Sequence, residues 1–297
     1  MPSISAHLLK AYARWHIKIR PSSADELVGH LRRHFNTHAL PVLPAPGIVR
    51  GHRRVAGIGV DTLSPAQPRA AVLYVHGGGY VAGITRTYFN MCSLWARRLQ
   101  LDIWLPDYRL APEHPYPAAL DDVRSVYLDM LQHYAPSNIV LAGDSAGGAL
   151  VLSLLLRLRD EGQPLPAAAL ALSPYADLSN SMNSRIRCDA RDDMLSLDML
   201  HSGRDIYLAG ADPRQPYASP AFGDYQQLPP LWLSCSQDEC LADDAQEVAR
   251  RARQAGVSVE LLERPQLPHV WPIFYPFIHE ARQDQEAILG FLRHHLP

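Results

Sequence analysis

Ser145 lies at the centre of a glycine-rich turn that could hold a serine nucleophile. Gly-Asp-Ser-Ala-Gly-Gly occupies residues 143–148 and fits the pattern Gly-x-Ser-x-Gly. Residues 137–142 form a short apolar run of the strand type, and residues 149–156 have a helical pattern. The flanking glycines permit a sharp turn, because a Cβ there would clash with the neighbouring strand or helix. We therefore expect a strained strand–turn–helix elbow that presents the Ser145 hydroxyl at the carboxyl end of a sheet.

A second glycine cluster offers amide groups that could stabilise negative charge. The apolar run at 70–75 ends in His-Gly-Gly-Gly at 76–79. Acyl transfer through serine builds up charge on the carbonyl oxygen, so N–H donors must already point at that position. Gly78, Gly79 and Ala146 are the predicted donors. Residues 77–82 also fit a dinucleotide-binding pattern, but such a site would not require the motif around Ser145 as well.

Serine at neutral pH needs a general base, and histidine is the side chain best suited to that task. In this arrangement the partners follow along the chain in the order serine, acid, histidine. His269 follows a β-prone run at 257–262 and a proline-containing stretch at 265–268, and it precedes the last expected helix. That position predicts a loop at the carboxyl edge of the sheet, within reach of Ser145.

These motifs together resemble a known family. His-Gly-Gly-Gly at 76–79 and Gly-Asp-Ser-Ala-Gly-Gly at 143–148 are signatures of the hormone-sensitive-lipase group of α/β-hydrolases, the bacterial carboxylesterases, and the segment 107–120 between them is similar to that family too. The likeness runs from about Val72 to the last helix, and residues 1 to about 45 carry no signature. It implies an α/β-hydrolase fold and a serine carboxylesterase that needs no cofactor and no metal.

Two neighbouring carboxylates compete for the role of the triad acid, Asp238 and Glu239, just after the expected strand at 231–236. The family usually shows Asp-Pro-Leu-x-Asp at this place, and the gapless match here is Glu-Cys-Leu-Ala-Asp at 239–243. Glutamate can serve, because the acid has to hold the imidazole tautomer and stabilise the imidazolium. We predict Glu239 as the acid and keep Asp238 as the alternative.

Apolar, β-prone runs alternate with helical segments along most of the chain. Strands are expected at 70–75, 101–105, 138–142, 168–173, 231–236 and 257–262, with one or two earlier strands within 48–60. Helices are expected at 88–99, 117–134, 145–160, 243–255 and 281–295. This alternation predicts an α/β fold, a mostly parallel twisted central sheet with helices on both faces.

Two segments have no place in that sheet, residues 1 to about 45 and about 179–217. The first contains a helix opened by Ser-Ala-Asp-Glu at 23–26, a capping-box spacing, and the second is polar and then helical from 196 to 208. The family resemblance implies that both form a cap above Ser145. We therefore expect one domain over 1–297, with a catalytic core of about 46–178 and 218–297.

Composition narrows the function further. The chain has 297 residues, 47% of them hydrophobic, and a formal charge of −2 without a basic block, which argues against a nucleic-acid partner. No apolar run reaches the roughly 18 residues that a membrane span needs. Four cysteines without a metal-like spacing, and no secretory signal, indicate a cytoplasmic protein. A charged cap and no long lipid-facing segment predict esters of short acyl chains, around butanoyl.

Several alternatives remain beside this interpretation. The same residues could serve an amidase or deacetylase, and the fold could carry a non-catalytic receptor for small molecules, although such receptors typically lose a triad member. His30, His34 and His38 share a helical spacing but lack an acidic or thiol partner, so we predict no metal site. Arg109 and Glu113 are expected to form a structural ion pair. A homodimer is expected from the resemblance and from the apolar segment 288–292, which would pack on a partner or on its own core.

Overall fold

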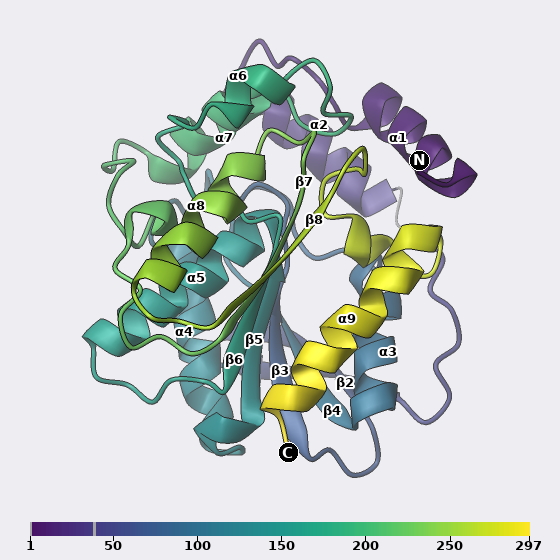
Figure 1. The fold of residues 1–297 in the computed structure, drawn as a ribbon, viewed down its shortest axis with the longest axis vertical. Helices are drawn as coiled ribbons and strands as arrows, with labels where there is room; N and C mark the ends of the chain where they lie inside the picture. The colour runs from purple at the N-terminus through teal and green to yellow at the C-terminus, as the bar shows by residue number, and fades with distance from the viewer. Residues whose placement is uncertain (1, 38–39) are drawn as a thin grey trace.

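The computed structural model describes residues 2–37 and 40–297. Within them, eight strands form one twisted sheet in the order β1-β2-β4-β3-β5-β6-β7-β8 (Figure 1). Pairing is parallel from β4 to β8, whereas β1 and β2 run antiparallel to their neighbours. A mostly parallel sheet is thereby confirmed. The strands are β1 (Val49–Val55), β2 (Ile58–Ser64), β3 (Ala70–Val75), β4 (Leu101–Asp107), β5 (Ile139–Asp144), β6 (Ala168–Leu172), β7 (Leu231–Ser236) and β8 (Val259–Arg264).

The central strands are apolar throughout because both faces of the sheet are covered. Along β3, the side chains of Ala71, Leu73 and Val75 belong to one buried cluster and those of Val72 and Tyr74 to the other. This period of two sends alternate side chains to opposite faces. The helices on the first face are α4 (Ala118–Met130), α5 (Ser145–Asp160) and α8 (Ala242–Gln254); α3 (Tyr88–Leu99) and α9 (His279–His295) cover the second.

Four helices gather at one end of the sheet, at the top of Figure 1: α1 (Ile4–His16), α2 (Ala24–Thr37), α6 (Ser184–Cys188) and α7 (Leu197–Leu208). We call these four helices, with the loops that join them, the cap. Polar contacts tie its two segments together, since Arg14 Nε donates to Asp193 Oδ1 at 2.7 Å and Lys18 Nζ to the Asp192 carbonyl at 2.6 Å. The segment that carries α1 and the segment that carries α6 and α7 therefore lie together in space, although they are far apart in sequence.

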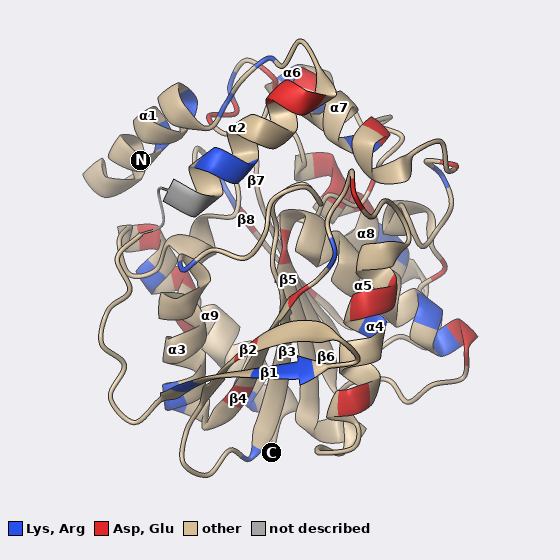
Figure 2. Cartoon of the chain, turned by 180° about the vertical axis from the view of Figure 1, so that it is seen from behind, with Lys and Arg blue, Asp and Glu red and all other residues tan. Residues whose placement is uncertain are grey.

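Charges of both signs are interspersed along the chain in the view of Figure 2. The edge strand β1 carries three arginines, Arg50, Arg53 and Arg54, which oppose pairing of that edge with another strand. Among the helices of the described residues, none is long and apolar enough to cross a membrane.

Candidate active site

Ser145 stands where strand β5 meets helix α5, in a backbone conformation with φ of 52°. A serine adopts this left-handed region only where its surroundings impose it. The neighbouring glycines explain how. A Cβ on Gly143 would lie 2.6 Å from the Gly147 carbonyl oxygen, and one on Gly147 would lie 2.1 Å from that of Val75 on β3. The elbow thus exists because strand and helix approach more closely than any side chain allows.

His269 places its imidazole against this hydroxyl. Its Nε2 lies 2.9 Å from Ser145 Oγ, and the residue is 3% exposed. It follows β8 and precedes the short helix η3 (Trp271–Phe274), as the sequence predicts for a loop at the carboxyl edge. The next residue, Val270, has φ of 53° and donates its N–H to Ser173 Oγ at 3.3 Å, which fixes the loop that carries the ring.

Glu239 completes a continuous chain of hydrogen bonds. Its Oε2 lies 2.8 Å from His269 Nδ1, and it is 1% exposed. Because a carboxylate only accepts, Nδ1 carries the proton and Nε2 is left to accept from the serine hydroxyl. Asp238 turns elsewhere: its Oδ2 accepts from Gln266 N at 2.8 Å, and its Oδ1 lies 3.4 Å from Arg191 Nη1. Of the two candidate acids, the structure brings only Glu239 to the histidine.

The electrostatics of this group favour a protonated histidine. Burial of the imidazole favours its neutral form, but the charge of Glu239 and its hydrogen bond outweigh burial and raise the pKa of His269 above its usual range. The carboxylates of Asp192 and Asp144 act in the same direction. The site therefore stabilises the imidazolium that forms when the ring takes up the serine proton.

Gly78 and Gly79 line the cavity beside Ser145. Their φ angles of 114° and 62° lie in a region that side chains rarely adopt, and a Cβ on Gly78 would meet the Ala82 carbonyl oxygen at 2.6 Å. Within residues 2–37 and 40–297, neither amide has an acceptor in the protein. Ala146 directly follows Ser145 at the start of α5. Gly78 and Gly79 thus border the same cavity as Ser145, and Ala146 is the next residue in the elbow.

Asp144 anchors the glycine loop, a role that the sequence did not reveal. Its Oδ1 accepts from Gly77 N and from Tyr74 Oη, both at 3.0 Å, and its Oδ2 accepts from Tyr88 Oη at 3.4 Å. Burial raises the pKa of Asp144 to about 6, against the lowering effect of these hydrogen bonds. Tyrosine partners on β3 and α3 have no spacing relation to Ser145, so no sequence motif could have marked them.

His76 holds the same loop and is unsuited to act as a second base. Its Nδ1 lies 2.7 Å from the Gly77 carbonyl oxygen, and its ring stacks on Tyr108 with centroids 4.2 Å apart. Burial lowers the pKa of His76 to about 4. A neutral, stacked ring is suited to a structural role.

The expected ion pair between Arg109 and Glu113 is wrong. Arg109 pairs with Asp122 of α4, with Nη2 and Oδ1 2.7 Å apart, and Glu113 pairs with Arg32 of the cap helix α2. Glu113 is four positions from Arg109 and Asp122 is thirteen, so the carboxylate nearer in sequence is not the one that the fold brings to Arg109. Glu113 therefore belongs to the contact between cap and core.

An apolar cavity of about 410 Å³ opens onto Ser145 beneath the cap. Its walls come from all parts of the molecule: Leu9 and Tyr12 of α1, Leu27 and Leu31 of α2, Met199 and Gly203 of α7, and Ile273 and Phe274 of η3, among others. Most of the lining is apolar, and the polar side chains among it include Tyr12 and His34 of the cap besides Ser145 and His269, so the cavity suits a small, mostly apolar molecule.

The two α2 histidines that the structure describes, His30 and His34, have different surroundings. His30 Nε2 contacts the Ile17 carbonyl oxygen at 3.0 Å, whereas His34 lines the cavity. His38 lies outside the described residues. The described part of the chain contains no group of three histidine, cysteine or acidic side chains that could hold a metal ion.

Comparison with known proteins adds independent evidence. Residues 72–273 match the family described as alpha/beta hydrolase fold. An acetyl-hydrolase of Streptomyces hygroscopicus is 40% identical over 228 residues, 76% of each chain. Among solved structures, an esterase from the bacterial hormone-sensitive lipase (HSL) family has 34% identity and a TM-score of 0.91 over 100% of both chains. EstE5, soaked with p-nitrophenyl butyrate, has 34% identity and a TM-score of 0.90 over 99% of both chains.

Proposed function

The chain belongs to the hormone-sensitive-lipase family of α/β-hydrolases and is a carboxylesterase, and from that premise we propose that Ser145 is the nucleophile of an acyl-enzyme mechanism. The observation that carries the proposal is the hydrogen-bonded chain from Ser145 Oγ through His269 to Glu239, at 2.9 and 2.8 Å. Ser145 and His269 line the mostly apolar cavity beneath the cap.

In this mechanism His269 takes the proton of Ser145 while the oxygen attacks the ester carbonyl. The carbonyl oxygen becomes negative and accepts hydrogen bonds from the amides of Gly78, Gly79 and Ala146. Protonated His269, oriented by Glu239, then gives its proton to the departing alkoxide. Water, deprotonated by the same histidine, attacks the acyl group on Ser145 and releases the acid.

Esters of short acyl chains are the proposed substrates. Supporting this preference are the names of similar proteins: the Streptomyces relative is an acetyl-hydrolase, and EstE5 was soaked with p-nitrophenyl butyrate. Charged side chains of the cap point the same way, since Arg14 and Arg20 pair with aspartates of the other cap segment. A protein that takes up long lipid chains needs a larger exposed apolar surface.

Covalent labelling tests the nucleophile directly. An organophosphonate should modify Ser145 alone, as located by mass spectrometry, and should abolish hydrolysis of nitrophenyl butanoate in proportion to labelling. Ser145→Ala should lose both the label and the turnover while it stays folded by circular dichroism. An adduct on Ser173 or Ser236 instead, with full labelling of Ser145→Ala, would reject the assignment.

We also propose that the segments about 1–45 and 179–217 act as the cap domain of a cytoplasmic enzyme. In support, all four cysteines are buried and none is in a disulfide among the described residues, as a reducing compartment favours.

We propose a homodimer on the family resemblance alone. The apolar segment 288–292 does not support it, because Ile288, Leu289 and Leu292 are buried in the chain's own core and offer no surface to a partner. Light scattering that shows a monomer at high concentration would end that proposal.

A further inference from the structure

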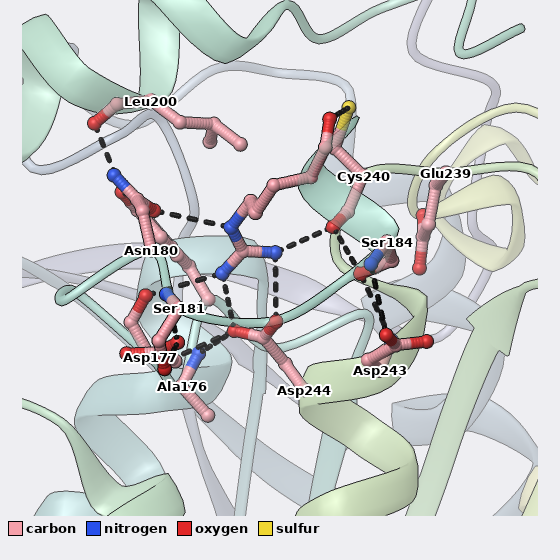
Figure 3. A network of polar contacts seen from close by, with 12 residues as sticks. Ala176, Asp177, Asn180, Ser181, Ser184, Leu200, Glu239, Cys240, Asp243 and Asp244 are labelled. Carbon is pink, nitrogen blue, oxygen red and sulfur yellow. Dashed lines mark hydrogen bonds and ion pairs between the residues drawn. The ribbon is translucent and has the colours of Figure 1, made fainter. Parts of the chain in front are cut away.

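The backbone just after Glu239 is held from both sides by the cap. The N–H of Cys240 donates to Asp192 Oδ2 at 2.8 Å, and its carbonyl accepts from Ser184 Oγ at 2.7 Å and from the Arg185 guanidinium. Figure 3 shows Ser184 and Cys240 in contact next to Glu239, with Asp244 below them. The N–H belongs to the peptide that joins Glu239 to Cys240, and the carbonyl belongs to the next peptide, so the cap holds the backbone on both sides of Cys240. The backbone beside Glu239 therefore has little freedom, and the cap restricts where the carboxylate of Glu239 can lie.

Asp192 and its neighbour Asp193 point in different directions, and Asp192 is the one that contacts the loop of Glu239. Its Oδ1 accepts from the backbone N–H of Met194 and Leu195, at 2.8 and 2.9 Å, and it is 3% exposed. Asp193 points the other way, to Arg14 and Lys10 of α1. Thus Asp192 is held by three backbone amides and faces the triad, whereas Asp193 serves the outer contact between cap segments.

The hydrogen bond from the Cys240 N–H to Asp192 restrains the backbone after the acid, a restraint that proline supplies in the family pattern. In Asp-Pro-Leu-x-Asp the acid is followed by proline, which fixes its own φ and has no N–H. Here the position is Cys240, which is not stiffened by a ring and whose free N–H is taken up by Asp192. The acid is also one methylene longer, and a longer side chain has more rotamers to restrain. With cysteine in place of proline and glutamate in place of aspartate, the loop of Glu239 needs an additional restraint.

We propose that Asp192 is a positioning residue of the catalytic triad: it fixes the loop of Glu239 through the Cys240 amide and places a second buried negative charge behind the Glu239–His269 pair. The proposal rests on the proposed function, in which that pair activates Ser145. The other charged groups around Asp192 and the pair are Lys18 of α1, which contacts the Asp192 carbonyl oxygen, Asp189 and Arg185 at α6, and Asp144 behind Ser145.

A charge at this place has a consequence that a purely structural residue lacks. The carboxylate of Asp192 contributes to raising the pKa of His269. Removing that charge lowers the pKa of the ring, so the neutral, active form persists to lower pH. The acid limb of the kcat/KM profile should therefore move to lower pH even as kcat falls. Loss of packing alone would lower activity without this shift.

The test compares Asp192→Asn and Asp192→Ala with the matched control Asp193→Asn, using nitrophenyl butanoate. We expect Asp192→Ala to lower kcat about ten- to a hundredfold, the range for one lost charge-assisted hydrogen bond, with KM within about twofold. Asp192→Asn keeps an acceptor and should lose less, yet both variants should shift the acid limb downward. Asp193→Asn should change neither kcat nor the limb.

Cys240→Pro provides a second, independent measurement because it removes the amide proton and leaves Asp192 in place. It should lower kcat in the native background, where the buried Asp192 carboxylate loses a partner, and cause no further loss in the Asp192→Ala background, where the contact is already absent and the proline ring restrains the backbone as in the family pattern. If Asp192→Ala does not fold, Asp192→Asn and Cys240→Pro still test whether Asp192 positions Glu239. An Asp192→Asn enzyme with native kcat and an unshifted limb would overturn the proposal. Native activity in Glu239→Ala would instead overturn the triad assignment itself.

Discussion

At the scale of single residues, replacing Asp238 and replacing its neighbour Glu239 should have very different effects on activity. Glu239 accepts from His269 Nδ1 inside the protein, whereas Asp238 accepts from the Gln266 amide at the loop surface. Glu239→Ala should lower kcat by about 10³–10⁴ at similar KM, because the lost interaction matters mostly while the imidazolium forms. Glu239→Gln should be nearly as damaging, since it keeps shape and loses charge. Steady-state kinetics with a nitrophenyl ester measures both.

Asp238→Ala is the matched control and should lose far less activity, through loop stability alone. In Glu239→Gln the remaining activity should extend to lower pH, because the pKa of His269 falls when its negative neighbour is removed. Both variants must keep the native circular dichroism spectrum. An inactive Asp238→Ala beside a nearly normal Glu239→Ala would mean that the assignment is displaced by one residue.

Asp144 carries a prediction about stability. Burial raises the pKa of Asp144 to about 6 in the folded chain, above the value of about 3.9 for an unfolded aspartate. Ionisation of this side chain therefore opposes folding, and the penalty grows between pH 4 and pH 6 and is complete above that window. Asp144→Asn lacks the penalty, so its melting temperature relative to the native protein should improve from pH 4 to pH 7.5. Calorimetry in both buffers measures the change.

The same variant should be a poorer enzyme. The native carboxylate holds the Gly77 amide and thus the loop of Gly78 and Gly79, which matters when charge develops on the substrate oxygen. We expect kcat to fall about tenfold, the effect of one weakened charge-assisted hydrogen bond. A relative melting temperature that worsens with rising pH would contradict the assigned burial of a charged group.

At the scale of elements, the regular part of the fold was predictable because its signals are local. Strands β3 and β7 and helices α3 and α5 begin and end where the sequence patterns predict, since uninterrupted apolar runs and turn residues mark them. The capping spacing at 23–26 is realised only in part: Ser23 Oγ accepts from Glu26 N, but Glu26 reaches back to Ser22 instead.

What could not be predicted depends on contacts between distant segments. Helix α6 is short and polar on the sequence, and it forms because Arg185 is buried against Asp244, with Nη2 and Oδ2 2.9 Å apart. Asp192 lies in an irregular loop, 47 positions before Glu239, and has no motif of its own. The predicted triad and oxyanion residues are brought together, and their catalytic roles stay predictions, but the residues that hold them in place required the structure.

Gly203 leads to a prediction about the wall of the cavity. It lies inside helix α7, where glycine is unfavourable by about 0.5–1 kcal/mol relative to alanine. Nothing steric requires it, since an added Cβ would meet only Leu27 Cδ2, at 4.0 Å. It lines the cavity between α2 and α7, so we infer that the space itself is what the glycine provides. Gly203→Leu should therefore discriminate against the longer members of an ester series.

Gly290 is the matched control, because it lies inside α9 with nothing within 4 Å of an added Cβ and does not line the cavity. Two ester series are needed, one varied in the acyl group and one in the alcohol. Gly203→Leu should lose kcat/KM increasingly with chain length in one series and not in the other, whereas Gly290→Leu should show no length dependence. A uniform loss in both series would contradict a role in specificity. Alanine at either position should raise the free energy of unfolding by up to about 1 kcal/mol.

At the scale of the whole molecule, polar contacts at several places attach the cap to the core. Arg32 of α2 makes one of them: its Nε donates to the Val81 carbonyl at 2.9 Å, and its Nη2 to the Ala111 carbonyl at 3.1 Å. Val81 belongs to the turn whose amides donate to the Gly78 carbonyl. One arginine thereby connects the cap to the loop that carries the predicted oxyanion donors.

The same guanidinium pairs with Glu113, and the two kinds of contact should differ in strength. Glu113 has 55% of its side chain exposed, so loss of the ion pair should cost less than about 1 kcal/mol. Val81 and Ala111 are buried, and a buried carbonyl left without its donor costs about 1–3 kcal/mol. We expect Arg32→Met to destabilise most, Arg32→Lys less, and Glu113→Gln least, as measured by thermal and urea unfolding.

KM, salt and pH distinguish attachment of the cap through the buried carbonyl groups from attachment through the Arg32–Glu113 ion pair. Arg32→Met should raise KM as the cap loosens over the cavity, whereas Glu113→Gln should not. Salt at 1 M screens an exposed pair and should remove any effect of Glu113→Gln, but not that of Arg32→Met. The Arg32 hydrogen bonds lower the pKa of Glu113 to about 2, so its contribution should be lost between about pH 4.3, the pKa of an unfolded glutamate, and about pH 2. Equal destabilisation by the two substitutions would show that the cap is held by the ion pair and not by the buried carbonyl groups.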